Sequence, residues 1–309
     1  MSTLFKKILF FILVLFCFSP YGSSAIALLA GIILASTLGN PFPEFTKKHT
    51  STLLQASVIG LGAGMNLKVV AIVGLDGIGH TIIGITLTGL IGYLLSRLLK
   101  TPQTLSTLIT VGTAICGGSA IAATGPILNA DNEEMSVSLG VVFILNAAAL
   151  FIFPPIGHFA TLTQHQFGLW AALAIHDTSS VVGAAMQYGA EALELATTVK
   201  LARALWIIPV SFLFAFFMKS KNKVKVPWFI FGFVLMAAAV TWIPELNPVG
   251  VHISNFAKKL LVVTLFFIGL NLNMASVKKV GVRPLLLGLI LWLIVGTTTL
   301  IAIKLNWII

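Results

Sequence analysis

Charged residues are scarce in this chain of 309 residues: only 9% of them are Asp, Glu, Lys or Arg, and nine are acidic. A soluble domain carries about 25% charged residues, and so few charges would leave large apolar patches in contact with water. The apolar share is 58%, and the mean hydropathy is +1.03. The shortage of charge therefore excludes a soluble domain and predicts an integral membrane protein.

Other features are missing as well. Only two cysteines occur, Cys17 and Cys116, and both lie in apolar stretches, so the sequence offers neither a disulfide framework nor a metal site. No Gly-x-x-x-x-Gly-Lys-Ser/Thr loop is present, so the chain has no nucleotide-binding site of that kind to drive it. We expect no metal, no cofactor and no enzymatic activity.

Long apolar runs fill the sequence and predict about eleven transmembrane helices. A bilayer core near 30 Å needs about 20 apolar residues per helix, so eleven spans leave no room for a separate soluble domain. We expect an all-α integral membrane bundle that forms a single polytopic domain over residues 1–309. The predicted spans are 8–20, 24–39, 51–67, 79–99, 104–125, 135–155, 167–189, 197–218, 226–243, 256–274 and 283–305.

Positive charge is distributed unevenly between the predicted connections. With the N-terminus in the cytoplasm, thirteen lysines and arginines fall on cytoplasmic connections and six fall elsewhere, while the acidic 131–134 segment lies outside. This bias predicts a multi-pass membrane protein with a cytoplasmic N-terminus. It also explains the net charge of +10 without a nucleic-acid partner. A cleaved signal peptide over residues 1–23 is the alternative to a retained first span.

Two parts of the chain resemble each other, namely 24–100 and 226–305. Seven spans separate the matched members, so the two parts would have opposite orientations, as in the inverted repeats of secondary transporters. Chance similarity between apolar segments is the alternative. At one constant offset, Leu53, Leu54, Gly62, Asn66 and Gly74 match Leu260, Leu261, Gly269, Asn273 and Gly281.

The central 104–218 segment carries the polar residues that predict a site. In the fifth span, Gly117 and Gly118 weaken the helix, and backbone freed in this way is tolerated only against protein or a watery cavity. A helix that restarts near Ser119 would direct N–H groups at an anion. Close packing through small residues is the alternative. We expect the substrate to contact Thr113, Cys116, Gly117, Gly118 and Ser119.

The seventh span contains five consecutive polar residues, His176 to Ser180. Ionisable residues at membrane depth usually mark a path for substrate or protons, although a segment at the interface would merely solvate them. Asp177 beside His176 would favour the imidazolium. We predict that His176 and Asp177 form a coupling pair and that Thr178, Ser179 and Ser180 bind substrate.

Polar residues in other spans extend this prediction. Lys200 and Arg203 lie one turn apart on one helical face, and the planar guanidinium of Arg203 suits an oxyanion, whereas Lys200 could equally reach the interface. Asn66 and Asn273 occupy matching positions in the repeat and are predicted to bind substrate. Asn146, in mid-span, is predicted to join helices.

The segment GTAICGGSA at 112–120, the His176-Asp177 pair and the Lys200-Leu-Ala-Arg203 run resemble the YeiH-like family of proposed sulfate exporters. The similarity covers most of the chain and keeps the order of these motifs. It implies a multi-spanning inner-membrane carrier. The chain departs from the family at Ser179 and Ser180, where members often carry Gln.

Three functions compete. The first is a secondary transporter that exports a small anion, sulfate or a related oxyanion or sulfonate, coupled to a proton or another ion. The second is a cation/proton antiporter that uses Asp177. The third is an intramembrane hydrolase that uses Ser119 and His176, although no Gly-x-Ser-x-Gly motif is present. A channel and a homo-oligomeric assembly both stay open, and the expected partners are the bilayer and the anion.

Overall fold

The computed structural model describes residues 3–218, 227–272 and 281–308, and within these ranges the chain forms helices and no strands. The predicted all-α membrane bundle is therefore confirmed. By length and composition, some helical segments could cross a membrane. They are Thr81–Leu99, Asn132–Phe159, Ala190–Phe217, Pro244–Asn271 and Val282–Lys304.

The chain folds into two compact units. The first unit combines Met1–Ile72 with Trp228–Met274, and the second combines Val73–Pro227 with Ala275–Ile309. Each unit therefore joins segments from distant parts of the sequence.

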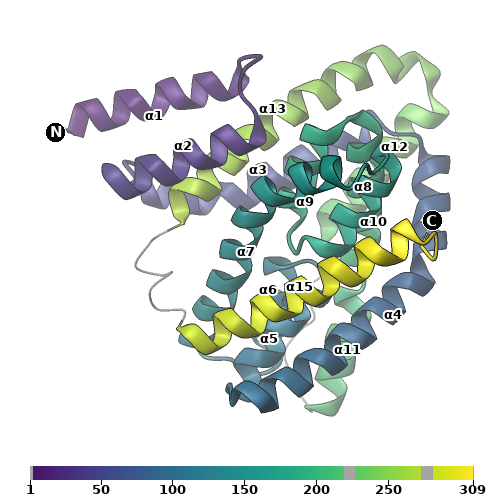
Figure 1. The fold of residues 1–309 in the computed structure, drawn as a ribbon. Coiled ribbons are helices and arrows are strands. Elements are labelled where there is room, and N and C mark those ends of the chain that lie inside the picture. The colour runs from purple at the N-terminus through teal and green to yellow at the C-terminus, as the bar shows by residue number, and fades with distance from the viewer. Residues whose placement is uncertain (1–2, 219–226, 273–280, 309) are drawn as a thin grey trace. The chain divides into compact units, whose positions relative to one another are not determined.

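The first unit is built around α13, which packs against α2 and α3 (Figure 1). α12 packs against α3, and α1 packs against α13 through Phe10, whose ring lies 5.8 Å from that of Phe266. The helices of this unit are α1 (Thr3–Phe18), α2 (Ser24–Thr37), α3 (Pro43–Gly62), α12 (Trp228–Trp242), the short 3-10 helix η1 (Pro244–Leu246) and α13 (Asn247–Asn271).

Glycines allow the helices of the first unit to cross at very short distances. A Cβ on Gly269 of α13 would lie 2.3 Å from the carbonyl oxygen of Leu28 on α2. A Cβ on Gly62 of α3, the residue that matches Gly269 in the repeat, would lie 2.4 Å from the carbonyl oxygen of Phe233 on α12. Any side chain at either position would push the crossing helices apart. The two matched glycines thus each allow a neighbouring helix to approach closely.

The contact between α3 and α13 is also reciprocal. Asn271, at the end of α13, bonds to Thr46 near the start of α3, with 2.8 Å between the two side-chain oxygens. Its repeat counterpart Gly64, just after α3, lies against Ser254 near the start of α13. Reciprocal contacts of this kind are expected of two elements related by a two-fold axis. The inverted repeat itself stays a prediction.

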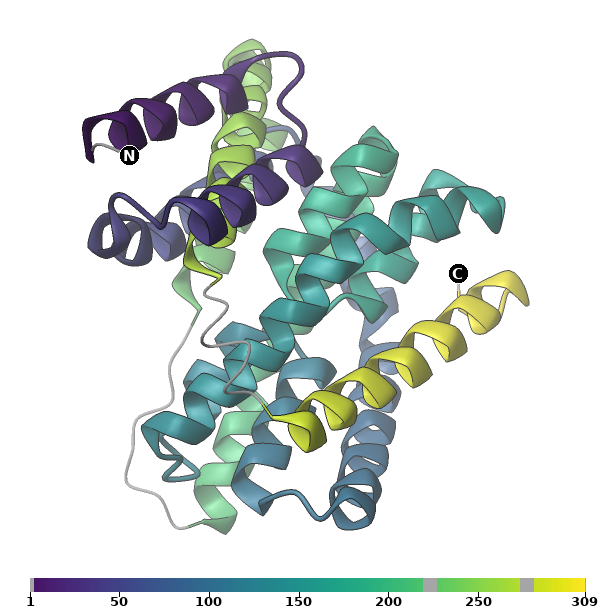
Figure 2. The same ribbon diagram turned by 60° about the vertical axis from the view of Figure 1, so that its left-hand side comes forward.

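The second unit contains most of α4 and all of the segments with central polar residues. α7 packs against α5 and α9, α10 packs against α8 and α9, and α15 lies across α5, α7 and α8 (Figure 2). Its helices are α4 (Leu67–Leu99), α5 (Gln103–Ala114), α6 (Gly118–Thr124), α7 (Asn132–Phe159), α8 (Gln164–Ala174), α9 (Thr178–Tyr188), α10 (Ala190–Ala204), α11 (Ile207–Phe217) and α15 (Val282–Lys304).

Each predicted span coincides with one helix or with two short helices separated by a break. The helix starts differ most: α3 begins at Pro43 instead of residue 51, α4 at Leu67 instead of 79, and α13 at Asn247 instead of 256. The prediction followed hydropathy, but a helix continues through polar residues as long as its backbone hydrogen bonds are made. The eighth span was predicted as one helix over 197–218, but it starts at Ala190 and is interrupted between α10 and α11.

Candidate functional site

The fifth span is interrupted in its middle. α5 ends at Ala114, α6 begins at Gly118, and Gly117 between them has φ +63° and ψ −126°. Residues with a side chain rarely adopt this conformation, so the turn requires glycine. The predicted break and restart near Ser119 are present in the described structure, with α6 starting one residue earlier.

The seventh span is interrupted as well. α8 ends at Ala174 and α9 begins at Thr178, after the extended Asp177. The carboxylate of Asp177 is the N-cap of α9: Oδ2 accepts the backbone N–H of Ser179 at 3.1 Å and also the Ser179 hydroxyl. An N-cap carboxylate satisfies free amides and opposes the positive end of the helix dipole. The polar run predicted from sequence is therefore a helix end followed by a helix start.

The two interruptions meet. A Cβ on Gly117 would lie 3.2 Å from Cα and 3.3 Å from Cβ of Asp177, so the two broken helices cross at their non-helical residues. Asn146 of α7 lies at the same crossing, where its Oδ1 accepts the backbone N–H of Asp177 at 3.2 Å. The structure thus brings together three residues from three separate spans.

Two cations from α10 complete the crossing. Nζ of Lys200 donates to the carbonyl oxygens of Ile175, at 2.7 Å, and Ala172, at 3.3 Å. The guanidinium of Arg203 donates through Nε to Ala114 at 2.8 Å and through Nη1 to Leu173. All four acceptors lie in the last turn of α5 or α8 or directly after it. Lys200 and Arg203 therefore bind the carbonyl ends of both interrupted helices.

Burial makes these interactions strong. Lys200 is 0% exposed and Arg203 is 2% exposed, so neither cation can be solvated by bulk water. Helix C-termini carry unpaired carbonyl groups and about −0.5 elementary charge. Lys200 opposes the end of α8, and Arg203 opposes the ends of both α5 and α8. The sequence left open whether Lys200 reaches the interface, and the structure buries it completely.

His176 lies beside the crossing without a hydrogen bond. It is 1% exposed, and neither Nδ1 nor Nε2 has a partner in the structure. The imidazole is therefore not hydrogen-bonded to the Asp177 carboxylate, with which the sequence predicts a coupling pair. Ser119 is exposed and makes no hydrogen bond with His176, so the geometry gives the hydrolase hypothesis no support.

The other predicted substrate residues are distributed unevenly. Thr178, Ser179 and Ser180 are buried at the start of α9, and Cys116 is buried in the first break. Thr113 is buried but bonds to the carbonyl oxygen of Ile109 in its own helix, at 3.0 Å. Gly118 is half-buried.

The two asparagines of the repeat do not join this group. Asn66 lies in the first unit, where its Oδ1 accepts the N–H of Lys68 at the start of α4, at 2.9 Å. Asn273 lies outside the described residues. Their predicted role in substrate binding therefore stays a prediction.

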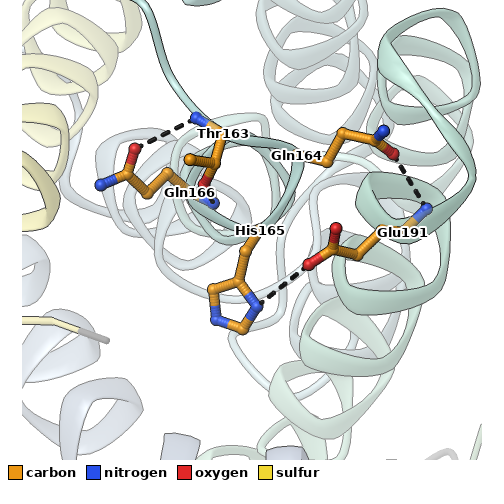
Figure 3. A network of polar contacts seen from close by, with 5 residues as sticks. All are labelled: Thr163, Gln164, His165, Gln166 and Glu191. Carbon is orange, nitrogen blue, oxygen red and sulfur yellow. Dashed lines mark hydrogen bonds and ion pairs between the residues drawn. The ribbon is translucent and has the colours of Figure 1, made fainter.

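A polar network ties the start of α8 to the start of α10 (Figure 3). Oε1 of Gln164 accepts the backbone N–H of Glu191 at 3.1 Å, and the exposed His165 lies 3.6 Å from the Glu191 carboxylate. Thr163 and Gln166 form a capping box on α8. α8 and α10 therefore start together and reach the crossing after a similar length, which brings Lys200 to the end of α8.

The structure adds two residues to the predicted site, Asn146 and Lys200. A single polar residue in mid-span is usually an interhelical contact, and nothing in the sequence shows that Asn146 faces a helix break.

In the described part of the chain no cluster of three or more His, Cys, Asp or Glu side chains could hold a metal ion.

These features define a class: polytopic α-helical membrane proteins in which two interrupted helices cross at their breaks. The family model described as "Conserved hypothetical protein 698" matches residues 8–288. The chain belongs to this family of UPF0324 membrane proteins, the YeiH-like group that its motifs resemble.

Relatives match the chain over nearly its whole length. UPF0324 membrane protein Bd1437 of Bdellovibrio bacteriovorus is 58% identical, over 99% of this chain and 97% of its own. A UPF0324 membrane protein of Bacteroides thetaiotaomicron is 51% identical, over 91% and 86%. UPF0324 membrane protein GSU2818 of Geobacter sulfurreducens is 47% identical, over 96% of each chain. No solved structure matches.

Proposed function

We propose that this protein is a secondary transporter that exports a small anion, sulfate or a related oxyanion or sulfonate, across the inner membrane. The observation that carries the proposal is the charge at the crossing. Among the described residues, Lys200 and Arg203 are buried there with a single buried carboxylate, Asp177. Buried charges must be compensated, and an excess of buried cations favours an anionic ligand.

The geometry suits transport. Two interrupted helices that meet within a membrane bundle give polar backbone and side chains a place away from lipid, as in transporters that bind substrate near the midplane. We propose a cytoplasmic N-terminus, following the charge bias, and coupling to a proton.

Thermal unfolding of the purified protein tests the proposal. Sulfate, sulfite, methanesulfonate and acetate are added as sodium salts, with sodium gluconate at the same ionic strength as the control. A bound anion at a hundredfold excess over its dissociation constant stabilises by about 2.7 kcal/mol. We expect stabilisation by at least one oxyanion. If no anion stabilised the protein, the proposal would be contradicted.

A matched pair of lysine variants places the effect at the crossing. Lys200→Met removes the buried charge at nearly constant length, and we expect it to abolish stabilisation by the anion. Lys259→Met removes a lysine that donates to a backbone carbonyl at the same 2.7 Å, from Nζ to Ser19 in the first unit. This control should respond to the anion as the wild type does.

A cation/proton antiporter is the second candidate, favoured by the burial of Asp177 at the crossing. Carboxylates are the usual carriers of protons and cations within membranes. Titration with sodium against choline, at constant anion, distinguishes the two. Stabilisation by sodium alone would favour the antiporter.

A further inference from the structure

The start of α9 already holds an anion that belongs to the chain itself. The Asp177 carboxylate accepts the N–H and the hydroxyl of Ser179, in the position where a free anion would bind a helix N-terminus. If the protein transports an anion, as proposed above, the substrate and Asp177 compete for the same donors.

Unused hydrogen-bonding groups lie at the same place. Asn146 is 4% exposed, and because its Oδ1 accepts the N–H of Asp177, its Nδ2 is held at the start of α9, where it has no partner. His176, directly before Asp177, has two unpartnered ring nitrogens. A buried polar group without a partner is costly, so these groups point to a ligand that the helix start accommodates.

Titratable and polar groups face Asp177 from the elements packed around it. α10 contributes Lys200 and Arg203, the first break contributes the thiol of Cys116, and the second break contributes His176. α7 contributes Asn146, which does not ionise.

The helix ends at the crossing add little net charge. The C-terminal ends of α5 and α8 together carry about −1 elementary charge, and the N-terminal ends of α6 and α9 together carry about +1. With Asp177 ionised, the two cations leave the crossing with an excess of about one positive charge. With Asp177 protonated, the excess rises to about two positive charges, which attracts an anion more strongly.

We infer that the Asp177 carboxylate is a resident anion at the start of α9. When a proton neutralises it, the substrate anion takes its place. The proton comes from water and binds a carboxylate oxygen of Asp177, which weakens the acceptor for Ser179. The anion then takes the freed donors together with Nδ2 of Asn146. On release both steps reverse, and one proton crosses the membrane with each anion.

Sulfate is the probe, because it does not titrate near neutral pH. Calorimetric titrations between about pH 5.5 and 8.5, repeated in buffers with different ionisation enthalpies, give both the dissociation constant and the protons taken up. For wild type we expect affinity to rise by up to about tenfold per unit of falling pH, with close to one proton bound per sulfate. This measurement needs no variant. Binding without proton uptake would overturn the inference and leave the transporter intact.

Variants identify the group that takes the proton. Asparagine is as good an N-cap as aspartate, so Asp177→Asn should keep α9 while sulfate binding becomes independent of pH and takes up no proton. Asp131→Asn is the matched control, because Asp131 caps α7 in the same way, with its carboxylate 2.7 Å from the N–H of Glu134. This control should behave as wild type.

His176→Gln tests whether His176, rather than Asp177, takes up the proton. We expect it to retain proton uptake. Proton uptake that survives in Asp177→Asn but is lost in His176→Gln would overturn the inference. A wild-type protein that binds no sulfate or other anion at any pH would overturn the proposed function, and the inference with it.

Discussion

At the scale of single residues, the crossing depends on two cations that stabilise backbone. A cation buried in a membrane protein is usually expected to face a counter-ion, but Lys200 and Arg203 donate to carbonyl groups at the ends of α5 and α8. Interrupting a helix leaves carbonyl groups without hydrogen-bond donors, and these two side chains supply the missing donors. The positive charge that we propose attracts an anion thus also holds the broken helices in place.

The role of Arg203 is testable by a conservative change. Arg203→Lys keeps the charge but loses the planar group that joins Ala114 to Leu173, so one helix end loses its partner. We expect the free energy of unfolding to fall by about 1.5–3 kcal/mol, measured by thermal melting in detergent without ligand. Arg97→Lys, at an exposed arginine bonded to Tyr93, is the control and should melt as wild type. Equal melting temperatures for both variants would contradict the assigned role.

Sequence alone identified most residues of the crossing but not their partners. His176, Asp177 and Arg203 were recognisable because ionisable residues are rare in apolar segments. The bond from Arg203 to Ala114 joins positions 89 residues apart, and no local pattern encodes it. Asn146 could not be distinguished from an ordinary contact between helices for the same reason.

At the scale of secondary structure, the two interruptions differ in how they are made. The first depends on the conformation of Gly117, whereas the second depends on the Asp177 cap. The adjacent glycines suggested the first break. The sequence did not predict the second break, because a polar run indicates a binding site as readily as it indicates a change of backbone direction.

The structure assigns different roles to the two adjacent glycines. Gly117→Ala places a side chain at φ +63° and 3.2 Å from Asp177, so we expect a loss of about 1–3 kcal/mol in stability and weaker anion binding. Gly118→Ala is the matched control. Its Cβ would lie 3.4 Å from Leu139, an ordinary contact at the first residue of α6, and stability should change little. Melting curves of both proteins test this, and equal losses would show that the break does not depend on Gly117.

At the scale of the whole molecule, the all-α bundle followed from hydropathy, but the grouping of helices did not. The first unit joins the N-terminal helices to α12 and α13. The matched glycines Gly62 and Gly269 indicated which helices correspond. The pairing of α2 with α13 and of α12 with α3 depends on three-dimensional contacts that the repeat alone does not specify.

Topology provides a prediction for the complete chain. The bias of thirteen cationic residues against six predicts that a reporter fused after Lys225 is cytoplasmic and that one fused after Glu134 is on the opposite side. Paired alkaline phosphatase and green fluorescent protein fusions measure this. Finding both positions on one side of the membrane would contradict the eleven-span arrangement.

The burial of the two cysteines has a practical consequence. Cys116 lies in the first break, next to Gly117, and Cys17 is buried in α1, so both thiols are shielded in the described structure. In a Cys17→Ala background, a water-soluble maleimide would modify the chain only when water reaches the crossing. The side from which the reagent is added would then reveal which face of the membrane is open. The native sequence thus already contains a chemical reporter of access, placed where the two interrupted helices meet.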